Sequence, residues 1–129
     1  MKSPTKLNVI NMSVTETKID AILDAISQDI AERETVANQA MRTLEKMKPS
    51  AEEYKDANLQ FGANAYVARY LKRIQEVVKE RDIKRAENII RFHHYQQHSI
   101  GALNDHRDIS LGQATVAVIL GGYVERFFK

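Results

Sequence analysis

Apolar residues recur at three- and four-residue steps through residues 13–48. Nine positions form this seam and eight of them are apolar: Ile19, Leu23, Ile26, Ile30, Arg33, Ala37, Ala40, Leu44 and Met47. A heptad pattern of this kind predicts a helix that packs at a shallow angle on another helix. Ser13 followed by Glu16 matches a capping box, so we expect the helix to begin there. We expect the stem of Arg33 to lie on apolar surface while its guanidinium reaches solvent.

A second helical pattern fills residues 51–100. Its apolar positions before residue 80 are Tyr54, Ala57, Phe61, Ala65, Ala68, Leu71, Ile74 and Val78. Polar residues then occupy the positions where apolar ones should follow, and the pattern resumes in a shifted phase from Ile83. We therefore expect a kink or short turn near residues 80–83, with Asp82 able to cap the segment that follows it.

The C-terminal stretch is apolar nearly all round. Ser110 and Gln113 form the capping pair that predicts its start, after a polar loop over residues 101–109. A helix with so little polar surface is either enclosed by its own chain or buried between subunits. We favour burial between subunits, because the two long helices already carry wide apolar stripes.

The connection between the two long stretches is short, which predicts an antiparallel hairpin. Pro49 ends the first helix, and Ser50 with Glu53 forms a capping box for the second. The fold class is therefore all-α: an elongated helical bundle built on a long antiparallel helix hairpin plus a buried C-terminal helix. We expect helices over about 14–48, 51–80, 83–100 and 111–128, within a single domain of residues 13–129.

Residues 1–12 contain Pro4 and a short apolar alternation from Lys6 to Asn11. We expect a flexible arm here, because chain ends are rarely held without a partner. The alternative is a β-strand that pairs with a second subunit.

Composition indicates one globular, soluble domain. The chain has 129 residues, of which 43% are hydrophobic and 28% charged. It has no cysteine, which excludes disulfides and thiolate metal sites and favours a cytoplasmic location. The apolar run from Ala114 falls far short of the ~20 residues that span a bilayer, and no signal peptide is recognisable, so we expect no membrane partner.

The net positive charge lies in residues 69–91, which hold eight basic and four acidic residues. Six of the basic residues lie broadly opposite the apolar stripe and form a possible nucleic-acid face: Arg69, Lys72, Arg73, Lys79, Lys84 and Arg91. Carboxylates at four-residue spacing, such as Glu76 after Lys72, lie on the same face and would weaken its field. We therefore favour a solvated or protein-facing surface.

The histidines are the other residues that could indicate a chemical function. His94 and His98 are one helical turn apart and Glu87 precedes them on the same face, so these three are weak candidates for a metal site. Neither a zinc-protease nor a di-iron motif is present, and we predict no metal and no cofactor. His93 lies on the apolar stripe, where a hydrogen-bonded core histidine is expected. No nucleophile or phosphate-loop pattern identifies a catalytic residue.

These observations predict a non-enzymatic helical protein–protein interaction module, structural, adaptor or inhibitory, that forms a homo-oligomer. The residues expected in its interaction face are Ile19, Leu23, Ile26, Ile30, Val118, Tyr123, Phe127 and Phe128. The alternative is a nucleic-acid-binding accessory protein that uses residues 69–91. A metal-dependent activity at the histidines comes third.

Overall fold

The computed structural model describes the backbone of residues 6–100 and 107–129, and the side chains of residues 14–97 and 107–129. The described backbone forms four α-helices and no strand, which confirms the all-α class. The helices are α1 (Lys6–Lys46), α2 (Glu52–Val78), α3 (Ile83–Ile100) and α4 (Arg107–Phe127). None of the helices, within the described residues, is long and apolar enough to cross a membrane.

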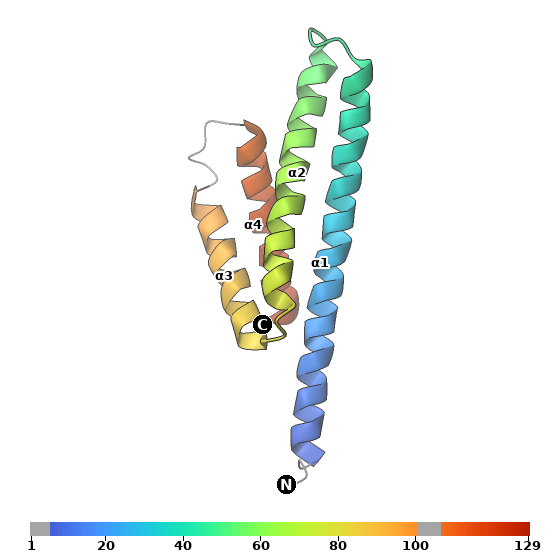
Figure 1. Cartoon of the computed structure of the whole chain (residues 1–129). Helices are drawn as coiled ribbons and strands as arrows, with labels where there is room; N and C mark the ends of the chain where they lie inside the picture. Colours follow the sequence, from blue (N-terminus) through green and yellow to red (C-terminus); the bar gives the residue numbers. More distant parts are fainter. Residues whose placement is uncertain (1–5, 101–106) are drawn as a thin grey trace.

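The two longest helices, α1 and α2, form the antiparallel hairpin that the short connection predicts (Figure 1). Every seam position of α1 from Ile19 to Leu44 is buried or half-buried, as is Met47 just after the helix. Arg33 is half-buried, and its Nη1 donates to Asn64 Oδ1 of α2 at 3.2 Å while its buried Nε has no partner. The guanidinium therefore bonds across the hairpin, where we expected it to reach solvent.

The helix starts differ from the three predicted capping boxes. Ser13 lies inside α1 and Ser110 inside α4, while α2 is capped at Ala51 without a side-chain hydrogen bond. A capping pair acts only where the backbone leaves the helix, and no glycine or proline interrupts the chain between Pro4 and Pro49. At α2, Glu52 and Glu53 supply negative charge to the first turn.

The arm predicted for residues 1–12 is helical from Lys6 onward, so α1 begins eight residues before the predicted residue 14. Residues 6–12 are therefore helical and do not form the alternative strand. Residues 1–5, and residues 101–106 of the predicted loop, lie outside the described residues. Residues 107–109 of that loop belong to α4.

The break predicted near residues 80–83 is present, because α2 ends at Val78 and α3 begins at Ile83. Arg81 adopts a φ of 64°, a left-handed conformation that reverses the chain direction. Asp82 caps α3, since its Oδ1 accepts a hydrogen bond from the Arg85 N–H at 3.1 Å. The Arg81 side chain pairs with Glu16 and Asp20 of α1, which ties the turn to the hairpin.

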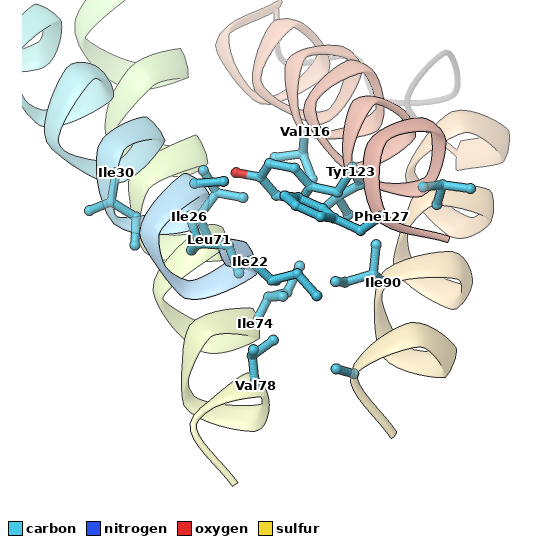
Figure 2. Packing of buried hydrophobic residues seen from close by; sticks show 14 of the residues in the cluster. Ile22, Ile26, Ile30, Leu71, Ile74, Val78, Ile90, Val116, Tyr123 and Phe127 are labelled. Atoms are coloured by element: carbon cyan, nitrogen blue, oxygen red, sulfur yellow. The ribbon is translucent and has the colours of Figure 1, made fainter. Parts of the chain in front are cut away.

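The core lies where all four helices meet, at the end of the hairpin that includes the α2–α3 turn (Figure 2). Tyr123 and Phe127 of α4 point toward Ile22 and Ile26 of α1, and Ile90 contributes from α3. The buried cluster consists of Ile19, Ile22, Ala25, Ile26, Ile30, Val67, Leu71, Ile74, Val78, Ala86, Ile90, Val116, Leu120, Tyr123, Val124 and Phe127. One chain therefore builds a closed core from its own helices.

Candidate functional site

The fold divides the eight residues predicted for the interaction face into a covered and an exposed group. Ile19, Ile26, Ile30, Tyr123 and Phe127 are in the core, and Leu23 and Phe128 pack against it. Val118 is 75% exposed. Contact with another molecule through the five buried residues would require the bundle to open, whereas Leu23 and Phe128 are half-buried. Val118 is the member of the group that is open to a contact on the intact bundle.

The side of α4 that faces away from the core is almost free of polar groups. It consists of Leu111, Ala114, Thr115, Val118 and Gly122, which we call the α4 outer face. The Thr115 hydroxyl donates to the Leu111 carbonyl at 2.8 Å, so its hydrogen bond is made within the helix. No charged residue lies between Asp108 and Glu125. An exposed apolar helix face of this kind can mark a contact with another molecule.

The opposite side of α4 is firmly held. Val116 and Leu120 are fully buried, and the Tyr123 hydroxyl donates to Asp29 Oδ2 of α1. Burial and this bond raise the pKa of Tyr123 far above its usual value, which keeps the phenol protonated. Gly112 lets α4 approach α2 closely, because a Cβ there would lie 2.6 Å from the Tyr66 ring. The outer face is thus presented on a fixed helix.

The six basic residues of the possible nucleic-acid face are all exposed, but they are not equivalent. Lys72 pairs with Glu34 at 3.0 Å, Lys79 with Glu76 at 3.2 Å, and Arg91 with Glu87 at 2.8 Å. Arg69, Arg73 and Lys84 have no ion pair within the part of the chain that the structure describes. The break between α2 and α3 also separates the six residues: three are on α2, Lys79 is at its C-cap, and Lys84 and Arg91 are on α3. The structure thus leaves half of the predicted cationic face unneutralised.

The histidines are not gathered into a metal site within the described residues, where no group of three potential ligands occurs. His94 Nδ1 lies 2.9 Å from the Ala117 carbonyl oxygen, and Glu87 pairs with Arg91. The His98 side chain lies outside the described residues. His94 therefore joins α3 to α4, and Gly121 makes room for it, because a Cβ there would lie 2.9 Å from the imidazole ring.

A groove of about 460 Å³ lies between α2, α3 and α4. We call it the α2–α3–α4 groove, and its lining residues are Tyr66, Tyr70, Arg73, Ile74, Val77, Ile89, His93, Gln96, Gln97 and Gln113. Its apolar part comes from α2 and α3, and its polar part from all three helices.

A chain of hydrogen bonds runs along this groove. Tyr66 donates to Gln97 Oε1 at 3.1 Å, and Gln97 Nε2 donates to the Tyr70 oxygen at 3.1 Å. The Tyr70 hydroxyl lies 2.5 Å from His93 Nδ1, so His93 is the hydrogen-bonded histidine that its place on the apolar stripe predicts. Burial lowers the pKa of His93, which favours the neutral ring that can accept this bond.

The sequence did not reveal this groove. Tyr66 and Tyr70 are one helical turn apart on α2, but Gln97 and Gln113 come from other helices and match no motif. Only the pairing of helices brings them together. The available signal was the combination of Tyr66, Tyr70 and Arg73 on one side of a helix that otherwise carries aliphatic core residues.

Comparison of the chain with protein-family models, with curated proteins and with solved structures finds no match.

Proposed function

We propose that this protein is a non-enzymatic helical interaction module that self-associates by pairing the α4 outer face of one copy with the same face of a second copy. The observation that carries the proposal is the 75% exposure of Val118 at the centre of an uncharged helix face, on a helix whose other side is fixed in the core. We also propose that it acts in the cytoplasm, consistent with the absence of cysteine.

An antiparallel arrangement of the two α4 helices suits the charges at their ends. Arg107 and Asp108 begin the helix, and Glu125 and Arg126 lie near its end. In a two-fold pair, Arg107 of one copy can lie near Glu125 of the other, whereas Asp108 lies against Gly62 of its own chain. Opposite charges would then flank an apolar centre, and the helix dipoles would oppose each other.

The small residues of the face support close helix packing. Ala114 and Gly122 have little or no side chain, and a Cβ added at Gly122 would meet nothing within 4 Å. A single helix face buries less than the roughly 800 Å² per partner of a standard interface. We therefore expect a reversible dimer whose population depends on protein concentration.

Sedimentation velocity over a concentration series tests this function. The wild-type protein should shift with concentration from the 14.7 kDa chain mass toward twice that mass. Val118→Lys should remain at the single-chain mass, because a buried lysine charge opposes the contact. Val14→Lys is the matched control, since Val14 is 62% exposed on α1, away from the α4 outer face, and it should dimerise like the wild type.

Wild-type protein that stays at single-chain mass throughout the series would overturn the proposal. Dimerisation retained in Val118→Lys would place the contact elsewhere and overturn it equally. Circular dichroism of both variants checks that the lysines leave the helices intact, which their exposure predicts.

Nucleic-acid binding is a second candidate, favoured by the three basic side chains that no described carboxylate neutralises, Arg69, Arg73 and Lys84. Fluorescence anisotropy with labelled random duplex and single-stranded DNA across a salt series tests it. Binding that weakens steeply with salt and is lost when all three are changed to glutamine would support this function. Absence of binding at low salt would contradict this second function.

A further inference from the structure

The α2–α3–α4 groove combines the features of a small-molecule site, and it lies apart from the α4 outer face. Its volume of about 460 Å³ falls in the range of roughly 300–1,000 Å³ that ligand pockets occupy. Ile74, Val77 and Ile89 supply aliphatic surface. The rings of Tyr66 and Tyr70, with centroids 5.8 Å apart and planes tilted by 40°, supply aromatic surface. Such a lining accommodates a flat apolar group.

The charge of the groove determines whether it attracts an anionic or a cationic ligand. Among the described residues that line it, Arg73 is the only charged one apart from the titratable His93, and no described carboxylate pairs with it. Its positive charge reaches the groove, because it acts against the burial that raises the pKa of Tyr66 and of Tyr70. A guanidinium presents several donors that match the two oxygens of a carboxylate.

The inner wall of the groove contains a hydrogen-bond acceptor to which no described residue donates. Gln113 is only 7% exposed, and its Oε1 is buried without a hydrogen-bond partner among the described residues. A buried acceptor in this condition is unfavourable, whereas the neighbouring Gln97 amide has both its oxygen and its nitrogen bonded. The polar wall is therefore incomplete at one point, on a residue that lines the groove.

We infer that the α2–α3–α4 groove binds a small aromatic carboxylate. The carboxylate pairs with Arg73 at the rim, and the ring lies among Tyr66, Tyr70 and the aliphatic residues. A ligand with a hydrogen-bond donor at its far end could also engage Gln113. This binding does not depend on self-association through α4.

Isothermal titration calorimetry with 2-naphthoate tests the inference, and 2-naphthamide serves as a probe with the same ring system and no charge. The wild type should bind 2-naphthoate more tightly than 2-naphthamide. Arg73→Gln should weaken 2-naphthoate binding by about tenfold to a hundredfold and leave 2-naphthamide binding unchanged. Arg69→Gln is the matched control, because Arg69 is an exposed, unpaired arginine one turn away that does not line the groove.

A second readout locates the ligand. In ¹⁵N-labelled protein, 2-naphthoate should shift the side-chain amide signals of Gln97 and Gln113, while Val118 and its neighbours on the α4 outer face stay unchanged. No heat and no shift with the wild type would overturn the inference. Equal weakening in Arg73→Gln and Arg69→Gln would show a diffuse attraction to basic surface, and shifts confined to α4 would show a probe bound to its outer face; either result also overturns it.

Discussion

The two ends of the α1–α2 hairpin are packed differently, although the same pair of helices forms both. At the four-helix end, Ile19, Ile22 and Ile26 are fully buried. Toward the hairpin tip, the buried seam positions are alanines, among them Ala37 and Ala57, and no residue of the core cluster lies between Ile30 and Val67. Large side chains are thus fully buried at one end, whereas toward the tip large seam residues such as Leu44 and Met47 are only half-buried.

This difference shows which end of the hairpin contributes most of the free energy of folding. Alanine lets two helix backbones approach closely but removes little apolar surface from water, and stabilisation follows that area at about 25 cal/mol per Å². Two isolated helices with such a seam are only marginally stable. The four-helix end therefore holds the tip in place, and the tip should open locally before the whole chain unfolds.

The largest expected effect comes from a cavity at the four-helix end. Ile26→Ala should lower the free energy of unfolding by about 3 kcal/mol, because Ile26 is fully buried and its neighbours belong to several helices. Met41→Ala is the control toward the tip on the same helix, where the side chain is 42% exposed, and it should change stability by about 0.5 kcal/mol or less. Urea unfolding followed by circular dichroism measures both.

Hydrogen exchange sharpens the same test. Ile26→Ala should reduce protection of core amides, whose exchange follows global unfolding, and leave tip amides unchanged if they exchange by local opening. Equal losses for Ile26→Ala and Met41→Ala, or a tip as protected as the core, would contradict the division of the hairpin into two regions.

The next effect concerns the link between α1 and α4. Tyr123→Phe should destabilise the protein by about 1–3 kcal/mol, because it leaves Asp29 without the buried hydroxyl that bonds it. Tyr95→Phe removes the same atom from a side chain that is 73% exposed and should have little effect. Since the native pKa of Tyr123 is raised, its contribution to stability is present below the normal tyrosine pKa of about 10 and is lost as the pH rises above it. An ultraviolet titration in which Tyr123 ionises with the exposed tyrosines would refute this.

A smaller effect on stability is expected at low pH. Burial lowers the native pKa of His93 below 6.5, so the unfolded chain binds a proton more readily than the folded one. The stability due to neutral His93 is therefore complete above about pH 6.5 and declines as the pH falls through the range below it. Urea unfolding at a series of pH values should show a shallower decline for His93→Gln than for the wild type. Identical pH profiles would show that His93 does not contribute to the pH dependence of stability.

The smallest net change is expected at Arg81. Arg81→Gly relieves the left-handed backbone but removes the ion pairs to Glu16 and Asp20, so the two effects oppose each other and stability should stay close to that of the wild type. Arg81→Ala removes the same pairs and keeps the unfavourable backbone, so it should be the less stable of the two. Thermal unfolding of both variants measures the difference, and an alanine variant as stable as the glycine variant would show that the backbone at this position is not strained.

The sequence predicted the parts of the fold that depend on local pattern. The α1 seam, the antiparallel hairpin and the Asp82 cap were predicted because period and capping are readable within a few turns of helix. The starts of α1 and α4 were not, since the Ser13 and Ser110 pairs occur inside helices that simply continue. A capping pair permits a helix to begin but does not force it to.

The candidate sites were less predictable because they depend on how helices pair. Val118 and Val116 are both valines of the same apolar helix, and only the direction from which α2 and α3 approach decides that one is exposed and the other buried. Tyr66 and Gln97 are 31 residues apart and bond only because α3 folds back beside α2. His93 was expected to form a hydrogen bond, but nothing in the sequence identified Tyr70 as its partner.

No residue of the core cluster lies in the outer half of the hairpin, so the length of the hairpin can change without changing the core. Removing or adding one heptad in each of α1 and α2 on the tip side of Gly62, beside which Asp108 of α4 lies, would keep the seam in register and change the reach of the hairpin by about 10 Å. The four-helix end, the α4 outer face and the groove would keep their structure. The molecule is thus a fixed base with an arm whose span is set by the number of residues in it.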